Sequence, residues 1–182
     1  MKVLSVLGSP RIDGNTAKLL KIFEDALSSE HCIEHIDLQG LNIAGCRECM
    51  TCRKCDPGNY CAIQDDMTPL FESVLACDVF VLATPVFTWS YTAQAKAFMD
   101  RLYALDAGTG SKLAGKKTAL IISAGGDAFD GADLIVAGFA KYADYNDMHH
   151  AGQVVSAPMA EGVVEPHTEA ALKALANSIC AS

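Results

Sequence analysis

Short apolar segments alternate with amphipathic segments along most of the chain. An apolar run rich in Val, Leu and Ile that ends at a turn is typical of a strand buried in a parallel sheet. Such runs predict five strands, at residues 2–8, 32–38, 78–85, 116–123 and 148–158. Apolar residues at helical spacing predict five helices, at residues 15–29, 65–77, 92–105, 133–145 and 166–179.

This alternation predicts a doubly wound parallel sheet in a single domain that spans residues 1–182. With 182 residues, of which 51% are hydrophobic, the chain is long enough to bury a core. Ligands of such sheets bind outside the carboxyl ends of the strands, near the point where the strand order reverses. The loops of interest therefore follow the first, third and fourth strands, at residues 8–16, 84–92 and 123–131.

The loop after the first strand, GSPRIDGNT, has the composition of an anion-binding turn. Free backbone N–H groups converge at the start of the following helix, where Asn15 is the expected N-cap. The loop is neither a Walker loop nor a dinucleotide fingerprint. It predicts either a phosphate cradle formed by Ser9, Asn15 and Thr16 with Arg11 as the local cation, or a plain turn before a capped helix.

The other two loops favour a flat, phosphorylated cofactor. Phe87 and Trp89 follow the third strand, where a planar ring could lie against them, unless they pack in the core or at a subunit interface. Gly125 and Gly126 follow the fourth strand and allow a ligand to approach the backbone closely.

Charge and composition exclude several other classes of function. Lys and Arg number 14 against 22 Asp and Glu, a net charge of −8, so a nucleic-acid or anionic-membrane partner is not expected. The apolar run at the N-terminus is too short for a signal peptide, and we expect a cytoplasmic protein. The chain has no Ser-His-Asp order and no H-E-x-x-H motif, so nothing indicates hydrolysis.

A cysteine-rich loop at residues 45–61 contains five of the eight cysteines. In a reducing compartment such a group is more often metal-binding or redox-active than disulfide-bonded. Consecutive C-x2-C-x2-C spacing favours an iron–sulfur cluster, since zinc ribbons usually separate two Cys pairs by roughly 15–20 residues. Zinc and metal-free thiols remain alternatives.

Several motifs together are similar to the NADPH-dependent FMN reductase family of flavodoxin-like proteins, and especially to its iron–sulfur flavoprotein branch. They are GSPRIDGNTAKLL, LNIAGC, CAIQDDM, ATPVFTWSYTAQAKAFMDRL and KKTALIISAGG. The similarity extends from the first strand to about residue 126, and more loosely to about residue 155. It implies a flavodoxin-like α/β fold of five parallel strands with helices on both faces.

The resemblance also implies a binding site for FMN. The phosphate would be held by Ser9, Arg11, Asn15 and Thr16. The isoalloxazine ring would lie against Pro85, Val86, Phe87, Thr88 and Trp89. Its far side would be closed by Ser123, Gly125 and Gly126.

Cluster-bearing members of the family carry C-x2-C-x2-C-x(4–7)-C before the DDM motif. Cys49, Cys52, Cys55 and Cys61 fit this spacing and are the predicted ligands of a [4Fe–4S] cluster. Cys46 is an alternative first ligand because it follows LNI, but Cys61 would then lie outside the usual spacing.

The expected function is electron transfer by FMN, which carries the chemistry, so no catalytic acid or base is predicted. NAD(P)H or a reduced ferredoxin-like carrier would be the donor and a small molecule the acceptor, in a homodimer or homotetramer with Trp89 and Tyr91 as candidate contacts. One alternative is an NAD(P)H-dependent FMN or quinone reductase without a cluster. Another is a zinc- or thiol-based redox-sensing module.

Overall fold

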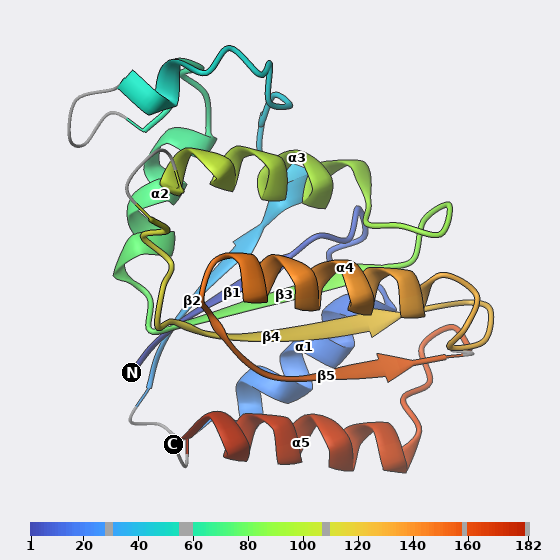
Figure 1. The fold of residues 1–182 in the computed structure, drawn as a ribbon. Coiled ribbons are helices and arrows are strands. Elements are labelled where there is room, and N and C mark those ends of the chain that lie inside the picture. Colours follow the sequence, from blue (N-terminus) through green and yellow to red (C-terminus); the bar gives the residue numbers. More distant parts are fainter. Residues whose placement is uncertain (28–30, 55–59, 107–109, 158–159, 181–182) are drawn as a thin grey trace.

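The computed structural model describes residues 1–27, 31–54, 60–106, 110–157 and 160–180. Its five strands form one parallel sheet with the order β2-β1-β3-β4-β5 (Figure 1). The strands are β1 (Lys2–Leu7), β2 (Cys32–Asp37), β3 (Val79–Pro85), β4 (Lys117–Ser123) and β5 (His149–Ser156). This order is the one found in flavodoxin-like doubly wound folds, so the predicted fold class is confirmed.

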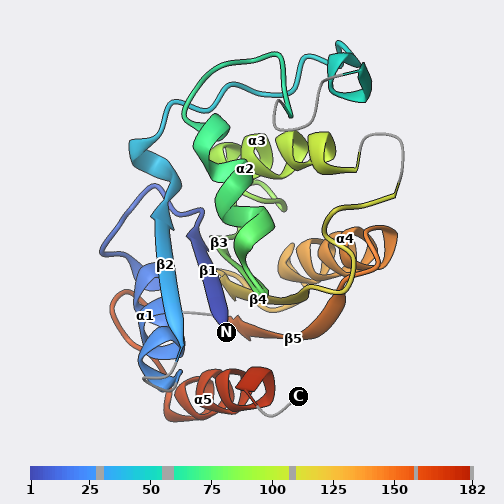
Figure 2. The ribbon, with the colours of Figure 1, turned by 90° about the vertical axis from the view of Figure 1, so that its left-hand side faces the viewer.

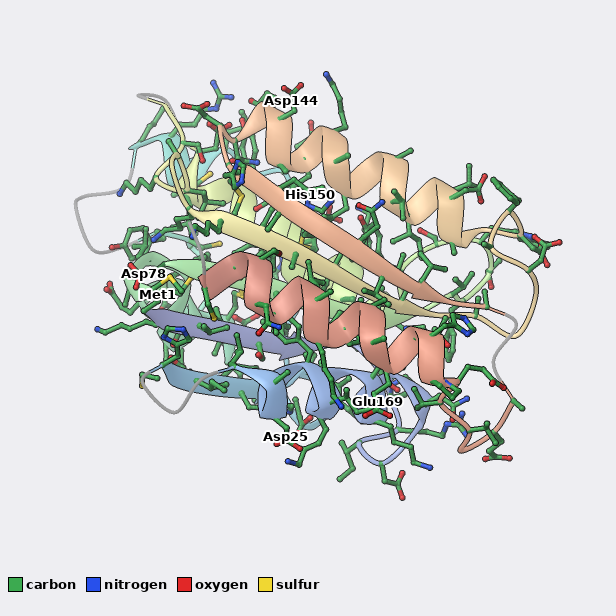
Figure 3. The ribbon with its side chains drawn as sticks, turned by 90° about the horizontal axis from the view of Figure 1, so that it is seen from below. Met1, Asp25, Asp78, Asp144, His150 and Glu169 are labelled. Carbon is green, nitrogen blue, oxygen red and sulfur yellow. The ribbon has the colours of Figure 1, made fainter. Side chains whose placement is uncertain are left out.

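Helices cover both faces of the sheet (Figures 1 and 2). They are α1 (Asn15–Ala26), α2 (Met67–Ala76), α3 (Ala93–Arg101), α4 (Ala132–Tyr145) and α5 (Pro166–Cys180). Helices α1 and α5 lie side by side on one face, which Figure 3 views from outside, with α2, α3 and α4 on the other. No helix in the described part of the chain is long and apolar enough to cross a membrane.

The central strands are buried on both faces because successive side chains point to opposite helical layers. Val6 and Leu82 pack toward α2, α3 and α4, whereas Leu7 and Val81 pack toward α1 and α5. Strand β2 lies at the edge of the sheet and is largely exposed. The reversal of strand order therefore falls between β1 and β3, where the loops after both strands open to one edge.

The predicted elements are all present, with two differences. The helix predicted at 92–105 is α-helical only to Arg101 and continues as a 3-10 helix, Leu102–Leu105. The predicted N-cap role of Asn15 is wrong: Gly14 is the N-cap, and Asn15 is the first helical residue. The side chain of Asn15 instead binds a distant segment of the chain, as described below.

His35 links the edge strand to α1 through two carboxylates. Its Nδ1 lies 2.7 Å from Oε1 of Glu24, and its Nε2 lies 3.1 Å from Oδ1 of Asp37. A neutral imidazole donates only one hydrogen, so this arrangement suits the protonated ring. Burial lowers the pKa of His35, but the hydrogen bonds to Glu24 and Asp37 outweigh it and the pKa is raised overall.

We expect this contact to make stability depend on pH. A raised pKa in the folded state stabilises the protein fully below the unfolded value of about 6.5, and this contribution is lost as pH rises through the folded pKa. The difference in free energy of unfolding between the wild type and His35→Gln should therefore be larger at pH 5.5 than at pH 8.5. Urea denaturation at both pH values measures this difference, and an equal difference at the two would contradict the assignment.

Candidate functional site

A cavity of about 370 Å³ opens at the carboxyl ends of β1, β3 and β4. Nine of the twelve residues predicted to bind the cofactor line it: Ser9, Arg11, Asn15, Thr16, Pro85, Val86, Phe87, Ser123 and Gly125. The other three, Thr88, Trp89 and Gly126, line an adjoining hollow that shares Val86 and Gly125 with the first. The fold therefore brings the three predicted loops together at one place.

Backbone hydrogen bonds that extend the sheet hold these loops in register. The N–H of Gly8 donates to the carbonyl of Ala83 at 2.7 Å, and the N–H of Val86 donates to the carbonyl of Ser123 at 2.9 Å. In the cavity wall, the hydroxyl oxygens of Thr16 and Ser123 lie 2.7 Å apart. The walls of the cavity are thus fixed by the sheet itself.

The first loop is folded by its own hydroxyl group. Oγ of Ser9 accepts a hydrogen bond from the N–H of Arg11 at 3.1 Å and donates to the Arg11 carbonyl at 3.0 Å. Ser9 and Thr16 are both buried, and helix α1 begins directly after Gly14. The start of α1 therefore presents unpaired backbone N–H groups next to the cavity, as an anion site requires.

A segment that follows β5 also reaches this cavity, which the sequence did not predict. Asn15 Nδ2 donates to the Ala160 carbonyl at 3.2 Å, and Asn15 Oδ1 accepts from the Gly162 N–H at 2.8 Å. Between these two bonds, Glu161 lines the cavity and forms an ion pair with Arg11 at 3.2 Å. The predicted cation thus has a carboxylate partner beside the candidate phosphate site.

The loop after β3 holds its aromatic side chains in solvent. Phe87 is 49% exposed and Trp89 is 60% exposed, so neither side chain packs in the core of this chain. Two backbone hydrogen bonds join Phe87 and Ser90, and the two residues between them, Thr88 and Trp89, have positive φ values of 48° and 57°. This is the backbone of a type I′ turn. Nε1 of Trp89 donates to Oδ1 of Asp130 at 2.7 Å, which fixes the indole beside the loop after β4.

Tyr91, one of the two predicted subunit contacts, has its hydroxyl group directed to α4. Its hydroxyl donates to the carbonyl of Ile135 in α4 at 3.3 Å, and burial raises its pKa to about 12. Its phenol group is therefore directed into the chain, whereas Trp89 remains exposed.

Helix α3 begins at the cavity. Thr92 is its N-cap: Oγ1 accepts from the N–H of Ala95 at 3.2 Å and donates to the carbonyl of Gly8 at 2.5 Å. A Cβ placed on Gly8 would lie 2.8 Å from the Cβ of Ala95. Only glycine allows this close approach between the first loop and α3.

The cysteine-rich loop surrounds a second cavity, of about 400 Å³, at the other end of α3. Its walls include Cys46, Cys49, Cys52 and Cys61. Cys55 lies outside the described residues. Each described cysteine is a free thiol, and within the described ranges no three His, Cys, Asp or Glu side chains lie close enough to hold a single metal ion.

The electrostatic environment of these thiols reflects their proximity. Hydrogen bonds from Thr51, with a smaller effect of Arg47, lower the pKa of Cys49. Burial raises the pKa of Cys52, and the neighbouring thiols Cys61, Cys49 and Cys46 raise it further. Four cysteines thus line one partly apolar space. This donor set and size suit a cluster, whose thiolate ligands stand farther apart than those of a single ion.

Comparison with known proteins places this architecture in a family. The profile of NADPH-dependent FMN reductases matches residues 1–162. An iron–sulfur flavoprotein of Methanosarcina thermophila is 33% identical over 102 residues, which are 56% of this chain and 52% of that protein. An iron–sulfur flavoprotein of Archaeoglobus fulgidus is 32% identical over 137 residues, 74% of this chain and 67% of the relative.

Among solved structures, an FMN-dependent NADH-azoreductase from Bacillus anthracis in complex with FMN superimposes with a TM-score of 0.71. The two share 14% identity over 98% of this chain and 99% of that one, which supports the shared fold. The class defined by fold and site is thus a flavodoxin-like domain with a ligand cavity at the switch point of its sheet. The chain belongs to the NADPH-dependent FMN reductase family, a family of flavin-dependent oxidoreductases. It spans about half the length of the first curated relatives that it matches.

The contact between Gly8 and α3 leads to a stability prediction. Gly8→Ala should lower the free energy of unfolding by about 1–3 kcal/mol, because the added methyl group overpacks the contact with Ala95. Gly40→Ala is the matched control, since a Cβ there meets no atom within 4 Å. Urea denaturation of both variants tests this, and equal stabilities would show that the first loop can move away from α3.

Proposed function

We propose that this chain is an FMN-dependent oxidoreductase of the iron–sulfur flavoprotein type. The observation that carries the proposal is the convergence of three loops on one cavity at the switch point of the sheet. One side of this cavity is an anion site at the start of α1, and the other is the exposed aromatic loop after β3. A ligand with a phosphate at one end and a flat ring at the other suits both features.

The residues of the cavity suit FMN, although Asn15 would take a different role from the predicted one. Backbone N–H groups at the start of α1 would hold the phosphate, with Arg11 as the cation. The ring would lie between the loop after β3, at Val86 and Phe87, and the glycines after β4. Asn15 would act mainly by fixing the segment after β5, because both polar atoms of its side chain already bind that segment. When bound, FMN supplies both hydride and single-electron transfer, while the protein provides binding and orientation.

The cysteine-rich loop would hold a [4Fe–4S] cluster. Support comes from the four thiols around the second cavity and from similarity to iron–sulfur flavoproteins. Cys49, Cys52 and Cys61 belong to the ligand set that spacing favours, and all three line the cavity. The cavity lining also includes Cys46, the alternative first ligand, whereas Cys55 lies outside the described residues, so spacing alone favours Cys55 over Cys46.

The electron partners that we propose are those expected for a flavin and a cluster in one protein. The second cavity lies beyond the far end of α3, whose nine residues span roughly 13 Å. We propose that NAD(P)H or a reduced ferredoxin-like carrier supplies electrons to a small acceptor. We also propose that the protein acts as a homodimer or homotetramer, with exposed Trp89 available for contact.

A metal and cofactor analysis of the anaerobically purified protein tests this function. We expect flavin absorption bands over a broad background that dithionite bleaches, with about four irons per chain. Flavin without iron would support the alternative, an FMN or quinone reductase whose cysteines bind no metal. Zinc without turnover would support the redox-sensing alternative, and failure to bind added FMN would overturn the central proposal.

Single substitutions decide the ligand set. Because spacing favours Cys55, we expect Cys55→Ala to lose most of its iron while retaining flavin, and Cys46→Ala to keep both. Cys32→Ala is the control, since Cys32 is an exposed thiol on β2, outside the cysteine-rich loop. Loss of iron in Cys46→Ala with retention in Cys55→Ala would instead establish the set of Cys46, Cys49, Cys52 and Cys61.

Glu161 should weaken binding of FMN, because its carboxylate competes with the phosphate for Arg11. Glu161→Gln is expected to lower the Kd for FMN by about two- to fivefold, the effect of an exposed ion pair. Titration of apoprotein with FMN, followed by flavin fluorescence, measures it. Glu165→Gln is the control, because it removes the same charge from the same segment but Glu165 does not line the cavity. Equal effects of the two substitutions on the Kd for FMN would contradict the competition.

A further inference from the structure

Both ends of the cysteine-rich loop meet one buried guanidinium group. The side chain of Arg101, the last residue of α3, is 0% exposed. Its Nη1 donates to the carbonyl of Ala44 at 2.9 Å, and its Nη2 donates to the carbonyl of Ile63 at 3.1 Å. Ala44 lies two residues before Cys46, and Ile63 two residues after Cys61. Arg101 thus closes the base of the loop.

Asp65 completes this closure. Its two carboxylate oxygens accept from Nη1 and Nη2 of Arg101 at 2.7 and 3.1 Å, in a two-pronged ion pair. The same carboxylate accepts from the N–H of Ala44 at 2.9 Å and from that of Met67 at 3.1 Å. Burial raises the pKa of Asp65, but Arg101 and these N–H groups lower it overall, so the carboxylate stays charged.

The fifth N–H donor of the guanidinium, at Nε, takes no part in these contacts. Nε of Arg101 is buried and has no hydrogen-bond partner among the residues that the structure describes. Arg101 lines the second cavity together with Cys61. A buried donor without a partner is costly, so a group that accepts its hydrogen is expected at this site.

We propose that Arg101 is a positioning residue for the cluster ligand Cys61. Its two terminal nitrogens fix the ends of the loop, and its Nε–H donates to the Cys61 sulfur when that sulfur is bound to iron. This inference rests on the proposed cluster. Hydrogen bonds to the sulfur ligands of an iron–sulfur cluster raise its reduction potential.

Lysine cannot replace this group in full. An ammonium group is a single point charge, whereas the planar guanidinium reaches two carbonyls, a carboxylate and a sulfur from one plane. Arg101→Lys therefore keeps the charge beside Asp65 but loses the donor to Cys61 or one of the loop contacts. Arg101→Met loses all of them and leaves Asp65 without its partner, so this variant alone could fail to fold.

The test compares wild type, Arg101→Lys and Arg101→Met, with Lys96→Met as control. Lys96 is an exposed cation on the same helix, paired with Asp100, and it does not line the cavity. Iron, acid-labile sulfide and flavin per chain are measured after anaerobic purification. The midpoint potential of the cluster is measured by redox titration.

We expect Arg101→Lys to lose iron at least threefold with flavin unchanged, and its remaining cluster to titrate at a more negative potential. Arg101→Met should lose iron almost completely, and Lys96→Met should match the wild type. An unchanged potential in Arg101→Lys would mean that Arg101 only ties the loop, and the inference about Cys61 would be wrong. A wild-type protein that binds FMN but no iron would overturn both this inference and the proposed cluster.

Discussion

The buried ion pair between Arg101 and Asp65 is the interaction on which the placement of the cysteine-rich loop depends. Two charges removed from water are costly unless they are paired and hydrogen-bonded. Here the carboxylate is only 7% exposed and takes part in four hydrogen bonds. Removing one partner of such a pair typically costs about 3–5 kcal/mol, because the other charge stays buried and uncompensated. The loop is therefore attached to the domain through a contact that tolerates little change.

Helix α3 connects the base of the cysteine-rich loop to the loop beside the other cavity. Its first turn is capped by Thr92, which also donates to Gly8 in the loop beside the flavin cavity. Its last residue is Arg101 at the base of the cysteine-rich loop. Between them, Phe98 is buried and stacks on Phe80 of β3, with ring centroids 6.2 Å apart. The two cavities are thus held at fixed positions by one short helix that is packed on the central sheet.

Periodicity and turn composition were sufficient to predict the fold and the three loops that meet at the first cavity. Five apolar runs separated by amphipathic helices permit few topologies, and the rule that ligands bind at carboxyl ends of strands identified the loops. Polar partners that are distant in sequence were not predictable in this way. Asn15 and Ala160 are 145 residues apart, and no local pattern connects them. Similarly, the helical pattern of residues 92–105 does not separate the buried Arg101 from the exposed Lys96.

The two cavities are built from separate parts of the domain. The lining of the flavin cavity comes from the loops after β1, β3 and β4 and the segment after β5, with no described residue of the cysteine-rich loop. The cysteine-rich loop in turn packs on α3 and is closed at its base by protein groups alone. Because closing a loop in advance removes much of its conformational entropy, the proposed cluster would need to order only the interior of the loop. The lining of the flavin cavity therefore shares no described residue with the lining of the second cavity.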